Sequence, residues 1–308
     1  MSAAEVPAGR PGVPEADRLI GRKVPVLTHG YVVLVDYMGS DAAIVQAARV
    51  SYGTGTKSLR DDRGLIRYLL RHRHTTPFEM VEFKFQIRLP IYVARQMVRH
   101  RSASINEYSA RYSVVPDEFD LPPAEEIRLQ SARNRQGGDA PVAPGVAEAF
   151  RSDLDRLGRE AYAAYRRALE SGVARETARL VLPLAYYTEW YWKIDLHNLL
   201  HFLSLRLDPH AQEEIRRYAA ELARVARIVC PVAYEAFEEF ELEGTVFGRR
   251  EKEAIRLLLG GAALDSALTG AGLGVRKDDG TPMRSGEGVE FLEKLERLRR
   301  GAGAGQTV

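Results

Sequence analysis

The clearest pattern in the chain is a strict alternation of apolar and polar residues over positions 81–89. Its apolar members are Val81, Phe83, Phe85, Ile87 and Leu89. Because successive side chains of a strand point to opposite faces, this alternation predicts a strand with one buried face. Pro90 ends the pattern and suits the first turn of a helix. Two further strands are predicted at 31–35 and 186–193, which are rich in β-branched and aromatic residues.

Apolar residues at helical spacing dominate much of the rest of the chain. They predict helices over the ranges 41–50, 61–73, 91–100, 146–171, 174–182, 195–207, 210–229 and 231–242. In the helix after Pro90, the residues Gln96, Arg99 and His100 share one face. Ser40 or Asp41, and later Asp195, are suited to cap helices. Few strands and many helices predict an α+β fold, in which helices pack on a small, mostly antiparallel sheet.

Breaks in these patterns divide the chain into parts. Residues 1–24 carry three prolines, lack apolar periodicity and predict a mobile N-terminal arm. Residues 123–146 are polar and rich in Pro and Gly, which predicts a surface loop or insertion. The main domain is expected over 25–243. Residues 244–308 then form a C-terminal extension of unknown role, with charged helical stretches between Gly-rich breaks.

The composition is that of a soluble globular protein. Of the 308 residues, 45% are apolar and 28% are charged, which excludes a disordered chain. The net charge of +2 argues against a general coat for nucleic acid. The single cysteine, Cys230, allows no intrachain disulfide and suits a reducing cytoplasm. No stretch approaches the ~18 uncharged apolar residues that a membrane span needs.

The segment with the densest chemistry runs from Arg95 to Arg111 and reads RQMVRHRSASINEYSAR. Its arginines offer planar forks of donors that suit phosphate groups. Its serines and asparagine can bond the neutral edges of a heterocycle. A solvated basic helix end explains the arginines but not the whole string. The low net charge favours a small phosphate-bearing ligand over a long nucleic acid, so an RNA- or DNA-binding protein is the second interpretation.

A second candidate feature is the pair His197 and His201, which lie one helical turn apart. This spacing can hold a metal, as in the zinc motif H-E-x-x-H. Here Asn198 replaces the glutamate that would act as a base, and no further ligand stands at a convincing spacing. A metallohydrolase that uses these two residues and His210 is the third interpretation, and no metal site is predicted.

The string from Arg99 to Tyr112, RHRSASINEYSARY, resembles the signature R-H-R-x-x-S-x-N-E-x-S-x-R-Y of flavin-dependent thymidylate synthases at every fixed position. Further segments resemble the same family in the same order. They are Ala47–Tyr52, His74–Glu79, Ala178–Pro183 and Leu205–Gln212. The resemblance covers about residues 27–242 and leaves out the N-terminal arm, part of the 123–146 loop and the extension.

The resemblance implies an activity, its cofactors and an assembly. The family methylates dUMP at uracil C5 to dTMP, with 5,10-methylenetetrahydrofolate as one-carbon donor and NADPH-reduced FAD as hydride source. The resemblance implies the family's own fold in a cytoplasmic homotetramer with active sites at subunit interfaces. The implied partners are small molecules, with no nucleic acid, membrane or metal.

The resemblance also implies roles for individual residues. The positions that match nucleotide-binding residues are Gln96, Arg99, Glu107, Tyr108, Ser109, Ala110, Arg111, Arg179 and Arg206. The positions that match flavin-binding residues are Ser51, His74, Thr76, Arg99, His100, Arg101, Asn106, Glu107, Asp195, Leu196, His197, His201 and His210. The loop from Glu107 to Arg111 is expected to reach a nucleotide held mainly by a neighbouring subunit.

Arg206 matches the catalytic position of the family. A guanidinium beside uracil N3 and O2 favours negative charge on the ring, which raises electron density at C5. Ser109 is a nucleophile by residue type, but a serine is weak without an adjacent base, so a positioning role is preferred. The unrelated class of thymidylate synthases attacks uracil with a cysteine. Cys230 has apolar neighbours, however, and is predicted to be buried and inert.

Overall fold

The computed structural model describes residues 11–50, 59–131, 137–276, 282–284 and 286–300. The chain divides into two compact units, Met1–Leu242 and Glu243–Val308. This division falls within one residue of the boundary expected between the main domain and the extension. Ser51, one of the expected flavin-binding residues, lies outside the described residues.

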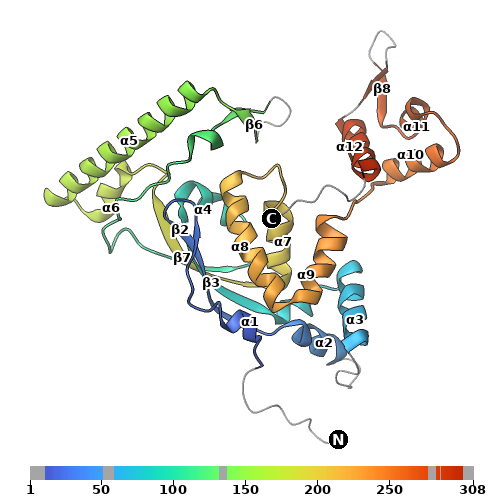
Figure 1. The fold of residues 1–308 in the computed structure, drawn as a ribbon, viewed down its shortest axis with the longest axis horizontal. Helices are drawn as coiled ribbons and strands as arrows, with labels where there is room; N and C mark the ends of the chain where they lie inside the picture. The colour runs from blue at the N-terminus through green and yellow to red at the C-terminus, as the bar shows by residue number, and fades with distance from the viewer. Residues whose placement is uncertain (1–10, 51–58, 132–136, 277–281, 285, 301–308) are drawn as a thin grey trace, which may run out of the picture. The chain divides into compact units, whose positions relative to one another are not determined.

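The first unit is built on a five-stranded sheet in the order β1-β2-β3-β7-β4, with all neighbours antiparallel (Figure 1). Its strands are β1 (Val24–Val26), β2 (Gly30–Met38), β3 (Glu82–Pro90), β7 (Tyr187–Asp195) and β4 (Ser104–Glu107). The alternation over 81–89 is confirmed, because Phe83, Phe85 and Ile87 are fully buried whereas Lys84 is exposed. The predicted combination of helices with an antiparallel sheet is confirmed as well.

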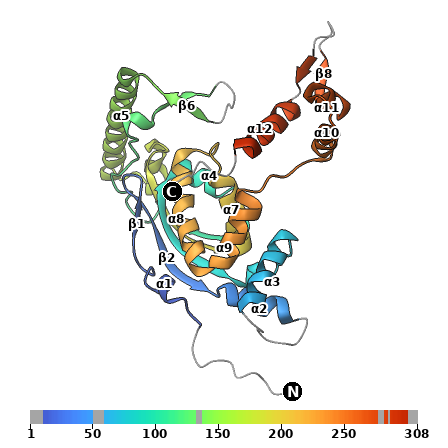
Figure 2. The same cartoon turned by 45° about the vertical axis from the view of Figure 1, so that its right-hand side comes forward.

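Helices cover the apolar face of this sheet, and Figure 2 shows the curved strands running behind α7 and α8. In the core, α8 packs on β1 and β2, α4 on β3, and α7 on β7. The helices are α1 (Pro14–Asp17), α2 (Asp41–Arg49), α3 (Leu59–Arg71), α4 (Ile91–Met97), α5 (Pro144–Glu170), α6 (Arg175–Ala178), α7 (Leu196–Arg206), α8 (Glu213–Val229) and α9 (Pro231–Phe237). Shorter helical turns are η2 (Phe78–Met80), η3 (Ala124–Glu126), η4 (Arg179–Val181) and the π-helical η5 (Glu238–Leu242).

Two predicted caps are present, whereas the helix ends beside the expected site residues differ from the expectation. The Ser40 side chain accepts from the Ala42 N–H at 3.3 Å and starts α2. Asp195 likewise accepts from the Asn198 N–H at 2.9 Å and starts α7. However, α4 ends at Met97 rather than near residue 100, and α8 begins after residue 212 rather than at 210. The residues just beyond α4 therefore lie on a turn, not on the helix face expected for them.

The 123–146 region contains more structure than the surface loop expected there. After η3, the strands β5 (Arg128–Gln130) and β6 (Gly138–Pro141) pair as an antiparallel hairpin. Glu126 of η3 forms an ion pair with Arg217 of α8 at 2.5 Å, which ties the region to the core helices. Backbone pairing forms these two short strands, which lack an alternating apolar face, so periodicity gives no signal for them.

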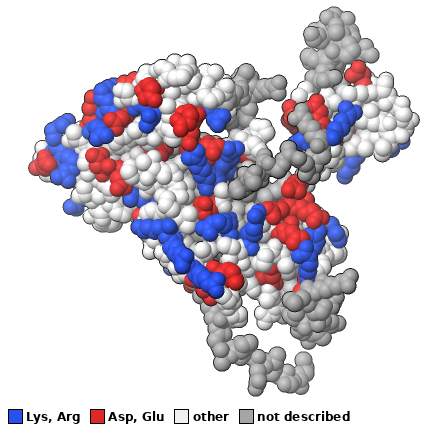
Figure 3. Space-filling model, in the orientation of Figure 1, with Lys and Arg blue, Asp and Glu red and all other residues white. Residues whose placement is uncertain are grey.

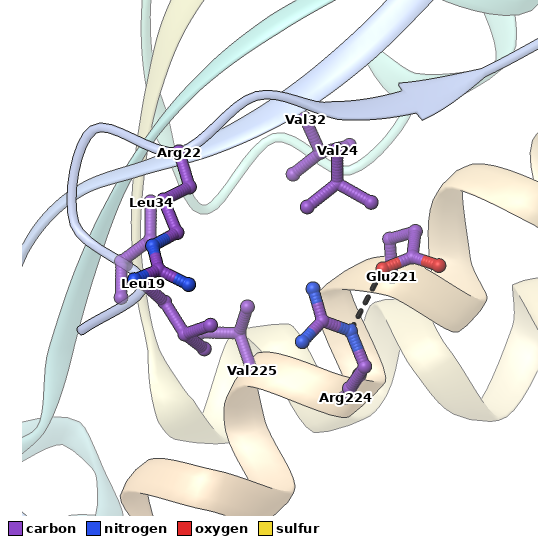
Figure 4. Close-up of a pocket in the computed structure, with 8 residues that line it drawn as sticks. All are labelled: Leu19, Arg22, Val24, Val32, Leu34, Glu221, Arg224 and Val225. Carbon is purple, nitrogen blue, oxygen red and sulfur yellow. Dashed lines mark hydrogen bonds and ion pairs between the residues drawn. The ribbon is translucent and has the colours of Figure 1, made fainter. Parts of the chain in front are cut away.

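The segment before residue 24 is not the mobile arm expected over its whole length. Ala16 of α1 is fully buried beside α8, and the Tyr37 hydroxyl donates to Asp17 Oδ1 at 2.6 Å. Val13 and Leu19 also pack against the core, and the Gly21 N–H donates to the Leu34 carbonyl at 2.9 Å. These contacts do not recur at a regular spacing, so the segment shows no periodic pattern. The crevice that it forms with α8 has a volume of about 10 Å³ (Figure 4). That volume is room for about one water molecule, so the crevice is no ligand site.

The second unit has a core of its own. Its described elements are α10 (Arg249–Leu259), α11 (Leu264–Gly270), β8 (Gly274–Arg276), β9 (Pro282–Arg284) and α12 (Gly286–Arg300). Leu268, Leu273 and Phe291 are buried together with Ala254. The extension is therefore a packed unit rather than a set of separate helical stretches. Across the described parts of both units, the helices are too short or too polar to cross a membrane.

Candidate active site

Arg206 is the last residue of α7, and the local sequence determines where it points. Leu199 and Leu203 of this helix are fully buried against the core. Arg206 follows Leu203 by three residues, so its side chain lies on the same face of the helix. Because the helix ends there, the guanidinium reaches the rim of the core and is half-buried.

The Arg206 side chain contacts the turn that follows α4. Its Nε donates to Nε2 of His100 at 3.0 Å, and its Nη2 donates to the backbone carbonyl of Gln96 at 3.4 Å. Burial lowers the pKa of Arg206 from its usual value, because the half-buried site disfavours the charge. The structure thus brings together three expected site residues from two distant parts of the chain.

The environment of His100 holds its imidazole neutral. Burial is the main cause that lowers the pKa of His100 to about 4, and the charges of Arg206 and His201 lower it further. The ring of Phe202 packs edge-on with centroids 4.8 Å apart, and the His201 ring lies 6.1 Å away. Because Nε2 accepts a hydrogen bond from Arg206, the single ring proton lies on Nδ1.

Gln212, to which the sequence analysis gave no role, joins the site. The side-chain amide of Gln96 donates to Oε1 of Gln212, the residue just before α8. Gln212 could have been recognised from the sequence, because it ends the segment Leu205–Gln212 that resembles the family. Gln212 and His210 also line a cavity of about 450 Å³ beside the β5–β6 hairpin. That volume lies within the roughly 300–1,000 Å³ of small-molecule sites.

The α7 histidines share their surroundings with the residues after α3. Burial raises the pKa of Glu241 in η5, and the charges of Arg73, His197 and His201 oppose this rise. These four side chains therefore lie close enough for their charges to interact. His74 follows Arg73, whose backbone φ of 59° turns the chain away from the end of α3. The imidazoles of α7 and the loop with His74 thus belong to one region.

The second half of the signature forms the exposed edge strand β4 and the loop after it. Glu107 accepts from Oγ1 of Thr188 in β7 at 2.7 Å, and the Tyr108 N–H donates to the Glu189 carbonyl at 2.8 Å. Asn106 and the other residues of β4 are exposed. Among the described residues, no hydrogen bond or ion pair joins this strand or its loop to Arg206. Within the described residues, Arg206 therefore bonds His100 of the first half of the signature and no residue of the second half.

The loop after β4 holds Ser109 without a partner that could activate it. Ser109 Oγ accepts from the Arg111 N–H at 3.4 Å, and the structure describes no basic side chain bonded to this hydroxyl. Ala110 packs against the small cluster around Tyr165 and Tyr186, which anchors the loop. A serine without an adjacent base is a weak nucleophile, and the positioning role of Ser109 stays a prediction.

The other expected ligand-binding residues lie around this region in different environments. Leu196 is fully buried in the core, so the flavin contact expected for it is left to its backbone and stays a prediction. Its N–H donates to the Val81 carbonyl at 2.8 Å, which joins α7 to the sheet. His210 pairs with Asp208 at 2.8 Å. Exposed side chains are found at Thr76, Arg99, Arg101 and Arg179, and also at His74, Arg111, His201 and His210.

Two other kinds of chemistry can be compared with the structure. Cys230 is fully buried, as predicted, and burial raises the pKa of its thiol well above the usual value, with a further contribution from Asp41. A thiol in this state is a poor nucleophile. Within the part of the chain that the structure describes, no three His, Cys, Asp or Glu side chains gather to hold a metal ion.

The charged surface gives a mixed picture. Basic and acidic side chains are interspersed over the first unit in Figure 3. Acidic side chains gather where the chain leaves α9, and η5 carries Glu238, Glu239 and Glu241 there. A long polyanion requires a continuous basic surface. The face in view is therefore better suited to small ligands than to nucleic acid.

Comparisons with known proteins extend the match beyond the signature. Residues 33–232 match the family model described as "Thymidylate synthase complementing protein". The flavin-dependent thymidylate synthase of Thermus thermophilus is 55% identical over 251 residues, which are 82% of this chain and 91% of that protein. The enzyme of the same name from Dictyostelium discoideum is 53% identical over 76% of this chain and 80% of its own length.

A solved structure shows the same fold. The UMP/dUMP methylase PolB from Streptomyces cacaoi, bound with 5-Br dUMP, superposes with a TM-score of 0.65 at 36% identity. The match covers 71% of this chain and 99% of PolB. Sequence identity, coverage and fold agree with the signature at residues 99–112. The chain therefore belongs to the family of flavin-dependent thymidylate synthases.

Proposed function

We propose that this chain methylates dUMP at uracil C5 to form dTMP, with 5,10-methylenetetrahydrofolate as the one-carbon donor. The names of its relatives and the activity of PolB support this reaction. The proposal rests on one structural observation: Arg206 is a half-buried cation whose guanidinium is bonded to the imidazole of His100 and to the carbonyl of Gln96. A cation held in this way can stabilise negative charge that develops on a bound ring.

Arg206 is the proposed catalytic residue. Its guanidinium lies beside uracil N3 and O2 and stabilises negative charge on those atoms, which raises the electron density at C5. C5 is the atom that forms the new carbon–carbon bond. The remaining nucleotide contacts are proposed for Gln96, Arg99, Glu107, Tyr108, Ser109, Ala110, Arg111 and Arg179.

The residues present fit a bound FAD. When bound, FAD reduced by NADPH supplies the hydride that completes the new methyl group. Arg99 and Arg101 are exposed, and among the described contacts no carboxylate engages either of them, so both can bind the phosphates of the cofactor. Further flavin contacts are proposed for Ser51, His74, Thr76, His100, Asn106, Glu107, Asp195, His197, His201 and His210.

We place the complete site between subunits of a homotetramer. The exposed strand β4 offers an unpaired edge, and Ile105, Tyr108 and Tyr112 expose large apolar surfaces on it and just beyond it. Such edges and patches are normally covered by a partner. A neighbouring copy would bring its Glu107–Arg111 loop to a nucleotide held by Arg206 of the first. The cytoplasm is the proposed location, since a single buried cysteine needs no oxidising compartment.

The purified protein is expected to bind FAD and to oxidise NADPH faster when dUMP is present. Nucleotide binding places the uracil in the site and commits the reduced cofactor to the reaction. The measurement is the visible flavin spectrum together with NADPH oxidation, with and without dUMP, followed by assay of dTMP. A protein that stays colourless after reconstitution with FAD would contradict the proposal, and tight RNA or DNA binding by such a protein would favour the second interpretation.

Replacing Cys230 by Ala should leave dTMP formation intact. The thiol is fully buried with a raised pKa, so it supplies no thiolate for attack on uracil. The smaller side chain should cost about 0.5–3 kcal/mol of stability, the usual range for a core substitution. The assay is turnover of labelled dUMP by folded variant that retains its flavin. Abolished turnover in such a protein would show that a cysteine nucleophile is needed.

A further inference from the structure

We propose that His100 is a positioning residue for Arg206, and that its imidazole directs the guanidinium while leaving its positive charge uncompensated. This inference rests on the proposed role of Arg206 in activating uracil. It differs from the flavin contact that the signature implies for His100, because it assigns the Nε2 atom to the arginine.

The hydrogen bonds of Arg206 explain how its direction is set. A guanidinium has five N–H donors. The Nε donor is used by His100 at 3.0 Å, and one Nη2 donor is directed to the Gln96 carbonyl at 3.4 Å. Two acceptors on one edge define the plane of the group. The donors that remain, including both on Nη1, can face a bound heterocycle.

The acceptors of Arg206 are both neutral, unlike those of many other arginines in the chain. Arg49 pairs with Asp62 at 2.7 Å, and Arg217 pairs with Glu126 and Glu213. The structure describes no such carboxylate partner for Arg206. A carboxylate would orient the guanidinium equally well, but its charge would cancel much of the field at the ligand. A neutral imidazole orients the cation without this loss.

The surroundings of His100 keep its ring in place. Phe202 contacts the ring edge-on, and the ring of His201, the residue before it in α7, lies 6.1 Å from that of His100. Arg206 and His201 are the charged or titratable groups that act on His100, and with burial they favour its neutral form. A ring that is packed and neutral is an acceptor with a defined direction, as an organised catalytic site requires.

The test compares three substitutions, His100→Gln, His100→Glu and His100→Ala. Gln keeps a neutral acceptor, Glu keeps an acceptor but adds a negative charge, and Ala removes the acceptor. At saturating dUMP and FAD, Ala should reduce kcat roughly tenfold to a hundredfold, the range for a misdirected catalytic group. Gln should restore most of the loss. Glu should remain as slow as Ala although it can still bond the arginine.

Crystal structures of the variants provide a readout that does not depend on activity. The Arg206 guanidinium should keep its direction with Gln and Glu and lose it with Ala. The matched control is His29→Ala, since His29 packs edge-on against Tyr187 at 5.8 Å and has no place in the proposed site. This control should turn over dUMP like the parent protein.

Three results would overturn the inference. The first is an Arg206 side chain that keeps its direction in the Ala variant. The second is a Glu variant as active as the Gln variant, because charge compensation would then be harmless. The third is a loss of kcat in the His100 variants that is fully explained by weaker flavin binding, measured as the amount of bound FAD. If Arg206→Ala itself proved fully active, the proposed function of Arg206 would fail, whereas the crystal structures would still decide whether His100 directs it.

Discussion

Replacing Arg206 by Ala is expected to lower the turnover of dUMP about a hundredfold while FAD binding persists. One lost charge-assisted contact to a developing anion costs about 3 kcal/mol. Since each 1.36 kcal/mol corresponds to about tenfold in rate, this loss corresponds to roughly a hundredfold. Arg206→Lys should recover only part of the rate. An ammonium keeps the charge, but it lacks the planar fork that bonds His100 and Gln96 together with a ligand.

The measurement is kcat at saturating dUMP, with bound flavin determined from the visible spectrum of each variant. Arg256→Ala is the matched control, because Arg256 is an exposed arginine paired with Glu253 in the second unit, outside the residues that match the family model. It should behave like the parent protein. Turnover of the Arg206→Ala variant within a few-fold of the parent would contradict the catalytic assignment.

Local patterns were sufficient to predict the elements that carry Arg206. The alternation over 81–89 depends on the period of two residues in a strand, and the buried leucines of α7 depend on the helical period. Asp195 could be recognised as a cap because its side chain bonds a nearby N–H within the same turn. These signals are all encoded by neighbouring residues, so they are readable from one sequence.

The contact between His100 and Arg206 could not be predicted in this way. The two residues are 106 positions apart, and the turn after Met97 that directs His100 has no periodic signal. The same limit applies to β4, whose residues are all exposed and whose strand character depends on pairing with β7. The family resemblance identified His100, Arg206 and the residues of β4 as one functional set. Only the fold shows that His100 bonds Arg206, whereas β4 pairs with β7.

The extension illustrates a different limit. Its charged helical stretches and Gly-rich breaks gave no reason to expect a separate core. Yet Leu268, Leu273 and Phe291 are buried together in it. Each helix there contributes only a few apolar residues, so the core becomes visible only when the helices are assembled. The residues that match the family model, 33–232, all lie within the first unit, so the core of the second unit is additional to the matched domain.

Replacing Gly30 by Ala is expected to destabilise the first unit by about 3 kcal/mol, at the upper end of the usual cost of overpacking. A Cβ at this position would overlap the Tyr218 hydroxyl and lie 2.6 Å from the Val26 carbonyl and 2.8 Å from the Arg88 carbonyl. Backbone oxygens of two neighbouring strands cannot both move away without disturbing the sheet. The displaced hydroxyl would also lose its hydrogen bond to the Arg88 carbonyl, at 2.8 Å, which joins α8 to β3.

Urea unfolding followed by tryptophan fluorescence measures this effect on the first unit alone, since the two tryptophans of the chain, Trp190 and Trp192, both lie in β7. Protein concentration is held constant so that subunit assembly does not alter the comparison.

Tyr218→Phe should cost about 1 kcal/mol for the lost hydrogen bond. Combined with Gly30→Ala, it should cost less than the sum, because removing the hydroxyl relieves one of the overlaps. Gly64→Ala is the control, because a Cβ at that exposed position of α3 would meet no atom within 4 Å. This substitution should be neutral or stabilise the helix by up to about 1 kcal/mol. An unfolding midpoint for Gly30→Ala equal to that of Gly64→Ala would show that the close approach of α8 to this end of the sheet does not require a glycine.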